Sequence, residues 1–350
     1  MEIARKKMEL QSKGVRIGHA LEERLLGDFP TATSDYLSFM MGGAPVAMLG
    51  GFYTDSSPYE IREMQEGHGI FEADELFTKI EFLKRPEFFD KTTSDGIKME
   101  KLGKLVAPGF LIVYLSTGCV YWGEMQCKFC VTGHINTIKN KRPEQVSELA
   151  NEGAREIGSH IALTSGALPK DRGSVLLAET AKKIKERADV AVSVNSEPPE
   201  DLNKINEMAS ADSIYINLEV FDEKKRREIM PGKSELKLAD YDRVFKRCTD
   251  VFDDNQVGSV LLAGLEEDDT YLEGVEHLAS MGVVPAVVPF YPTSLSKLND
   301  MAPPSKERME NIYLKSIDII NDYGLDPFKT KAGFIKGGAL SAMKEVIQNV

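Results

Sequence analysis

Between residues 105 and 300, short unbroken runs of apolar residues alternate with longer segments in which apolar positions recur at helical spacing. An unbroken apolar run of strand length is typical of a strand buried on both faces of a parallel sheet. Such runs predict strands at residues 110–115, 161–164, 190–194, 213–218, 257–262 and 284–288. Helices are expected at residues 143–157, 174–188, 199–209, 240–252 and 270–281, with a charged helix from Glu223. Repeated strand–helix units predict an α/β fold with a parallel sheet, either open and doubly wound or closed into a barrel.

The segments on either side of this region follow other patterns. Residues 2–26 are charged and helical in spacing, and a second helix is expected at residues 74–83. Residues 1–104 are therefore predicted to form a mostly helical N-terminal extension, to which no motif assigns a function. Residues 301–350 are predicted to form a helix at 306–323 followed by a Gly-rich tail.

Composition narrows the classes of function. Of the 350 residues, 42% are hydrophobic and 28% are charged, which allows a sizeable core and excludes wholesale disorder. The formal net charge of −12 argues against a nucleic acid or an anionic membrane as partner. No apolar run approaches the roughly 20 residues that span a bilayer, and the charged N-terminus does not resemble a secretory signal. We therefore expect a cytoplasmic protein.

Polar and small residues follow the predicted strands directly. In parallel β/α architectures the active site lies at the carboxyl ends of the strands. The residues at these positions include Ser165 and Gly166, Asn195, Glu219 and Gly264. Glu219 is the strongest signal among them, because a carboxylate at the end of an apolar strand needs a partner.

Three of the four cysteines crowd into the loop after the first strand. Seven residues separate Cys119 from Cys127, and two separate Cys127 from Cys130. Three thiolates at this density suit a four-iron, four-sulfur cluster with one iron left open. They also suit zinc if His134, four positions after Cys130, supplies a fourth ligand. The position of the loop at the active-site end of the sheet favours the cluster.

The cysteine loop, with Phe129 before its last cysteine, resembles that of the radical S-adenosylmethionine (SAM) superfamily. The usual family spacing has three residues in the first gap, where this chain has seven. Residues 213–235, 257–267 and 289–292 are similar to the biotin synthase and lipoyl synthase group. The resemblance covers residues 105–300 and implies a partial or full (β/α) barrel of the TIM type.

The resemblance also implies cofactors and roles. Cys119, Cys127 and Cys130 would hold a [4Fe-4S] cluster, and SAM would bind its open iron and yield a 5′-deoxyadenosyl radical that abstracts hydrogen from a small-molecule substrate. A flavodoxin or ferredoxin would supply the electron. The resemblance further implies a set of residues that contact SAM at its adenine, amino group, ribose or carboxylate. These residues are Phe129, Ser165, Gly166, Asn195, Glu219, Arg226, Lys233 and Gly264. Spacing favours Lys233 over Arg226 as the cation.

Two features limit the reaction. Only Cys248 remains outside the loop, so a second cysteine-held cluster that donates sulfur is disfavoured. Rearrangement, carbon–carbon bond chemistry, and methyl or methylene transfer in cofactor or amino-acid-derived biosynthesis remain. Position Ala167 lacks the acid that relatives carry beside the SAM amino group. A non-catalytic partner subunit that binds SAM or a cluster, or a zinc-stabilised α/β binding protein, are therefore the alternatives.

Overall fold

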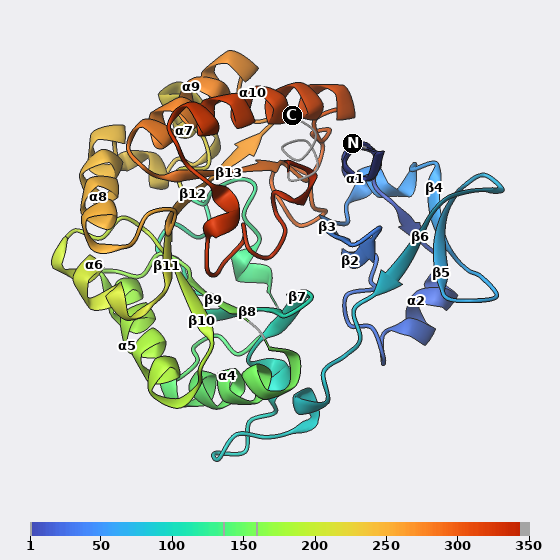
Figure 1. Ribbon diagram of the computed structural model, residues 1–350, viewed down its shortest axis with the longest axis horizontal. Coiled ribbons are helices and arrows are strands. Elements are labelled where there is room, and N and C mark those ends of the chain that lie inside the picture. Colours follow the sequence, from blue (N-terminus) through green and yellow to red (C-terminus); the bar gives the residue numbers. More distant parts are fainter. Residues whose placement is uncertain (1, 136, 159, 344–350) are drawn as a thin grey trace.

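The computed structural model describes residues 2–135, 137–158 and 160–343, which form two sheets with helices packed around the larger one (Figure 1). The larger sheet has the order β13-β12-β11-β10-β9-β8-β7. Its strands from β8 to β13 are all parallel, and β7 is antiparallel to β8. The strands are β7 (Lys104–Ala107), β8 (Phe110–Ser116), β9 (His160–Ser165), β10 (Ala191–Ser196), β11 (Ser213–Ile216), β12 (Val257–Ala263) and β13 (Val284–Pro289).

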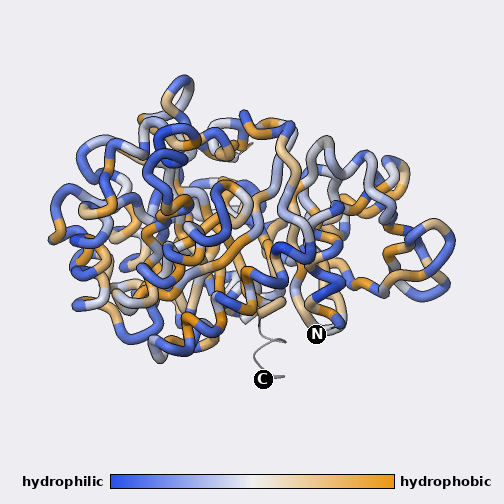
Figure 2. Tube along the Cα trace, turned by 90° about the horizontal axis from the view of Figure 1, so that it is seen from above, coloured by the Kyte–Doolittle hydropathy of each residue, from blue (hydrophilic) through white to orange (hydrophobic). Residues whose placement is uncertain are grey.

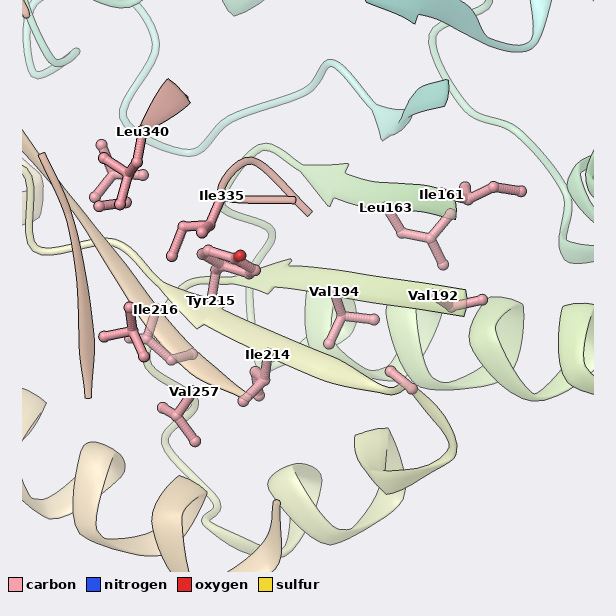
Figure 3. Close-up of a cluster of buried hydrophobic side chains, with 14 of the residues drawn as sticks. Ile161, Leu163, Val192, Val194, Ile214, Tyr215, Ile216, Val257, Ile335 and Leu340 are labelled. Carbon is pink, nitrogen blue, oxygen red and sulfur yellow. The ribbon is translucent and has the colours of Figure 1, made fainter. Parts of the chain in front are cut away.

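The larger sheet curves into a partial barrel with its helices outside, as expected (Figure 1). Apolar side chains on the outward face of the strands, such as Ile161, Leu163, Val192 and Val194, form the core beneath these helices (Figure 3). The helices are α4 (Pro143–Ile157), α5 (Arg172–Arg187), α6 (Asn203–Glu207), α7 (Glu223–Ile229), α8 (Leu238–Val251), α9 (Asp268–Ser280) and α10 (Lys306–Asp322). None of the described helices is long and apolar enough to cross a bilayer.

The N-terminal region is a sheet, so the prediction of a mostly helical extension is wrong. Its strand order is β1-β4-β5-β6-β2-β3. The strands are β1 (Arg16–Ile17), β2 (Tyr36–Met41), β3 (Ala44–Leu49), β4 (Tyr59–Glu63), β5 (His68–Glu72) and β6 (Glu75–Phe82). The helices are α1 (Glu2–Lys13), α2 (His19–Leu25) and α3 (Phe52–Asp55).

Two local features explain the difference. The predicted helix at residues 2–26 stops at Lys13, because Gly14 takes a φ of 73° and packs against Thr54, where a Cβ atom would come within 2.6 Å of a methyl group. Residues 74–83 contain strand β6, in which buried Ile80 and Phe82 alternate with the exposed Glu81. This period of two is the strand signature.

The N-terminal sheet lies against the open side of the partial barrel, between β7 and β13. From β2, Ser38 donates a hydrogen bond of 2.7 Å to the carbonyl of Val106 on β7. Helix α1 packs on α10, where Arg5 and Glu310 form an ion pair of 2.7 Å. Both lobes have apolar interiors and hydrophilic surfaces (Figure 2).

The C-terminal segment packs into the base of the barrel. Ile335 lies against Tyr215 (Figure 3), and the Tyr215 hydroxyl donates a hydrogen bond of 3.2 Å to the carbonyl of Ala332. Phe334 packs edge-on against Phe110, at the start of β8. This segment and the N-terminal sheet together close the space inside the barrel.

Candidate functional site

The cysteine loop begins directly after β8 and is held by three neighbouring loops. Strand β8 ends where its unbroken apolar run ends, and the backbone N–H of Val120 then donates to the carbonyl of Ala167 in the loop after β9, at 2.9 Å. The N–H of Lys128 donates to Ile229 O at the end of α7, at 2.8 Å. The N–H of Lys297 donates to Lys128 O, also at 2.8 Å. The loop is thereby fixed over the carboxyl end of the sheet.

The three cysteines of this loop converge. All are free thiols and half-buried. Burial raises the pKa of Cys127 and Cys130, and neighbouring thiols add to it: Cys130 acts on Cys127, and Cys119 acts on Cys130. Thiols that perturb one another need a cation or a cluster to be stable as thiolates.

His134 does not complete a zinc site. It is exposed, and its ring packs edge-on against Trp122 with centroids 5.3 Å apart. Across the described parts of the chain, no three His, Cys, Asp or Glu side chains gather closely enough to hold one metal ion. A four-iron cluster spreads its thiolates over different irons, so wider spacing of the sulfurs suits it.

Lys233 joins two carboxylates beside the cysteine loop. Lys233 is 3% exposed, and its ammonium group lies 3.1 Å from Glu219 Oε2 and 3.3 Å from Glu197 Oε1. It also donates a hydrogen bond of 2.8 Å to the carbonyl of Asn217. Burial alone lowers the pKa of Lys233, but Glu197 and Glu219 raise it well above its ordinary value. The lysine therefore stays charged, and one ammonium group faces two acids.

Glu219 stands at the end of β11 in a strained conformation. Its φ is 68°, a region that residues other than glycine seldom occupy. Backbone hydrogen bonds of 2.8 and 2.9 Å to Val260 and Leu262 on β12 hold it there. Burial raises the pKa of Glu219, and Glu219 in turn acts on the thiols of Cys127 and Cys130. Strain of this kind is typical of functional positions.

A cavity of about 160 Å³ opens beside these groups, lined by Tyr121, Ser165, Gly166, Asn195 and Glu197, among others. Two polar atoms at this site, Asn195 Oδ1 and Glu197 Oε2, are buried and have no hydrogen-bond partner among the described residues. Buried acceptors without donors are costly. A ligand carrying N–H or O–H groups would satisfy them, which is the donor set of a nucleoside or an amino acid.

Other predicted site residues lie around this centre. Phe129 packs in an apolar cluster with Val220 and Phe290 rather than in the cavity. Arg226 stacks on the Tyr241 ring at 4.8 Å and donates to Leu236 O, so it does not pair with Glu219. Gly264 takes a φ of 104° in the turn after β12.

Gly166 is required by packing. A Cβ atom at this position would lie 2.1 Å from the carbonyl oxygen of Gly118 and 3.2 Å from Cys119 Cβ. The end of β9 therefore touches the first cysteine of the loop. Ser165, the residue before it, donates to the Gly166 carbonyl at 2.8 Å and lines the cavity.

Two functional features received no role from the sequence. Glu197 is a polar residue directly after the strand expected at 190–194, but no motif assigned it a partner, and only the fold brings it to Lys233. Tyr114 points to the inner face of β8, where burial and then Cys130 raise its pKa to about 12. Tyr114 lies two and four residues after Ile112 and Phe110, so the strand period of two places it on the same face of β8 as these residues. This spacing was the one sequence signal for its position.

Part of the chain is similar to a known protein family, and the chain also has similar solved structures. Residues 113–279 match the Radical SAM superfamily. Among solved structures, the crystal structure of HydG, a maturase of the [FeFe]-hydrogenase, matches with a TM-score of 0.49 and 19% sequence identity. The match covers 61% of this chain and 50% of that one, so the chain spans half the length of that structure. A search of curated proteins gave no match.

Proposed function

We propose that the protein is a radical SAM enzyme that acts on a small molecule, because residues 113–279 match the Radical SAM superfamily. The observation that carries the proposal is the meeting of three groups at one end of the sheet. These are the converging thiols of the cysteine loop, the Lys233 ion-pair cluster, and a cavity with unpaired buried acceptors.

Different residues of the chain would hold the cluster and SAM. Cys119, Cys127 and Cys130 would hold a [4Fe-4S] cluster, and the cavity beside Ser165 and Gly166 would hold SAM. When bound, the cluster supplies the electron that cleaves SAM to methionine and a 5′-deoxyadenosyl radical. Asn195 and Glu197 would accept hydrogen bonds from SAM, which gives their buried oxygen atoms the donors that they lack.

The charged groups would orient SAM. Lys233 is placed to neutralise a carboxylate, and Glu219 to accept from a hydroxyl or amino group. Arg226 is held on Tyr241 and would act on SAM only through its charge, while Phe129 and Gly264 lie outside the lining of the cavity and would support it from behind. The N-terminal sheet and the C-terminal segment would close the side and the base of the barrel, which limits the access of water to its interior from those directions.

The number of cysteines in the chain bears on the class of reaction. With Cys248 as the only further cysteine, a second cysteine-held cluster for sulfur transfer is disfavoured. Rearrangement, carbon–carbon bond chemistry, or methyl or methylene transfer in biosynthesis fits better. Residues 213–235 and 257–267 support a place near biotin synthase and lipoyl synthase within the superfamily. A cytoplasmic setting with a flavodoxin or ferredoxin as reductant belongs to the same proposal.

The test begins with iron and acid-labile sulfide analysis of anaerobically purified protein. Dithionite and SAM are then added, and 5′-deoxyadenosine is measured by mass spectrometry. We expect iron, sulfide and 5′-deoxyadenosine from the natural chain, and none of the three from Cys127→Ala. A cluster without any 5′-deoxyadenosine would instead identify a non-catalytic partner subunit, and zinc in place of iron would overturn the proposal.

A further inference from the structure

Two cavities meet where the N-terminal sheet closes the barrel. The first, which we call the seam cavity, has a volume of about 290 Å³ and a mainly apolar lining. The second, which we call the Lys104 cavity, has a volume of about 710 Å³ and a mixed lining. They share Tyr36, Ile112 and Tyr114, so the two spaces adjoin. A molecule in them would touch both the N-terminal sheet and the barrel.

The seam cavity is built for an apolar body. Its walls include Pro45, Ala47 and Met48 of β3, and Phe110 and Val288 of the barrel. Apolar cavities with few polar groups are typical of small-molecule sites.

Two buried polar atoms of the seam cavity are unpaired among the described residues. They are the Tyr291 hydroxyl and Gln11 Oε1. Lys7, at the same wall, is not free, because it donates to the carbonyls of Pro45 and Gly338 and to the Ser341 hydroxyl. A ligand in this cavity would therefore find two hydrogen-bonding positions, while the three donors of Lys7 are already used within the protein.

The Lys104 cavity, by contrast, carries surplus positive charge. Of the charged side chains lining it, Arg85 and Glu100 pair with each other at 2.9 Å. Lys101, Lys104 and the exposed Asp35 make no ion pair within the described residues. The lining therefore has one more cation than anion.

A buried lysine adds to the charge of the exposed Lys104 from behind the cavity wall. Lys141, 3% exposed, donates hydrogen bonds of 2.7 to 3.0 Å to Tyr114 O, Thr137 Oγ1 and Ile138 O, all of them lining residues. Among residues 2–135, 137–158 and 160–343, no carboxylate lies within 4 Å of it. Burial lowers the pKa of Lys104, and burial together with Lys104 lowers that of Lys141 to about 8. Two neighbouring ammonium groups without a carboxylate attract an anion.

We propose that the adjoining cavities bind one amphipathic anion, with its apolar body in the seam cavity and its carboxylate or phosphate at Lys104. Calling this anion the substrate rests on the proposed function, since β8, which leads into the cysteine loop, lines both cavities through Ile112 and Tyr114. Binding itself needs neither SAM nor an electron. The N-terminal region would thereby contribute to binding, because its sheet supplies Tyr36 and Ala47 to the site and its helix α1 supplies Gln11.

The experiment measures binding to the full chain, purified anaerobically, by isothermal titration calorimetry without SAM or reductant. The probes are 4-phenylbutyrate, phenyl phosphate and the neutral 4-phenylbutyramide. We expect one or both anions to bind at least tenfold more tightly than the amide. Whichever anion is preferred identifies the group that Lys104 selects, and either preference supports the proposal.

Four variants locate the site. Lys104→Met should reduce the affinity for the anions to that of the amide, and Lys104→Arg should restore it. Ala47→Met should fill the seam cavity and weaken all three probes. Lys79→Met, an exposed lysine on β6, is the matched control and should change nothing. Equal affinity for anion and amide, or equal effects of Lys104→Met and Lys79→Met, would overturn the proposal, with melting temperatures confirming that each variant folds. Because no turnover is measured, this result is independent of whether 5′-deoxyadenosine forms.

Discussion

At the residue scale, Lys233 supplies the single positive charge between two carboxylates, Glu219 and Glu197. Lys233→Met would leave both acids near each other without a counter-charge. Breaking a buried ion pair in this way costs about 3–5 kcal/mol of unfolding free energy. Urea denaturation measures the loss, and the exposed Lys237→Met should stay within about 0.5 kcal/mol of the natural chain. If both variants unfold alike, the pairing at Lys233 is not stabilising.

The cysteine loop gives a second prediction at this scale. Cys130→Ala should lose the iron of the anaerobically purified protein, because a thiolate of the cluster is removed. His134→Ala should keep it, since the exposed His134 ring contacts Trp122 and not the thiols. Elemental analysis for iron and zinc checks both variants. Loss of metal from His134→Ala would show that the imidazole is a ligand.

Residues were predictable from the sequence where chemistry is concentrated in a short segment. The cysteines share one loop, and Glu219 is an acid at the end of an apolar strand, so both could be identified. Tyr114 and Lys141 could not. Each looks like an ordinary residue of its segment, and its role depends on neighbours that only the folded chain supplies.

At the scale of elements, the end of β9 meets the cysteine loop at Gly166. A methyl group there would lie 2.1 Å from the Gly118 carbonyl oxygen, so Gly166→Ala must displace one of the two segments. Overpacking of this kind costs about 1–3 kcal/mol. We expect a lower melting temperature and less iron per chain. Gly27→Ala is the matched control, because a Cβ atom at Gly27 would have no neighbour within 4 Å, and unchanged iron in Gly166→Ala would contradict the contact.

Elements were predictable where their pattern was long and regular. The helix at residues 143–157 was expected with the bounds that the structure gives α4, and the six parallel strands were located to within a few residues. Strand β6 was mistaken for a helix because Glu, Leu and Lys favour helices, while the alternation that buries Ile80 and Phe82 is short. Tertiary pairing with β5 and β2 decided its conformation.

At the scale of the whole molecule, no pattern in the sequence predicted that the two ends of the chain close the barrel. The N-terminal sheet and the segment after residue 331 come from opposite ends of the chain, and contacts of such long sequence separation leave no local pattern. They meet around β8 and β9, where His160 stacks on Phe110 with centroids 4.5 Å apart. Packing of the C-terminal segment against this stack buries the base of the barrel.

This closure predicts a dependence of stability on pH. Burial lowers the pKa of His160 to about 4, although a hydrogen bond with the backbone of Gly333 opposes the shift. Between pH 4 and 6.5 the unfolded chain therefore binds more protons at this position than the folded chain does, so stability rises with pH across that window. The contribution is complete above pH 6.5 and is lost as the pH falls to 4. It corresponds to a slope of up to about 1.4 kcal/mol per pH unit.

The measurement is the free energy of unfolding in urea at pH 4.5, 5.5, 6.5 and 7.5, for the natural chain and His160→Gln. Other groups titrate equally in both, so the difference between the two curves isolates His160. That difference should favour the natural chain increasingly as the pH rises to 6.5 and then level off. Parallel curves for His160→Gln would mean that water or the C-terminal segment accommodates the charged imidazole, and that the barrel base is open.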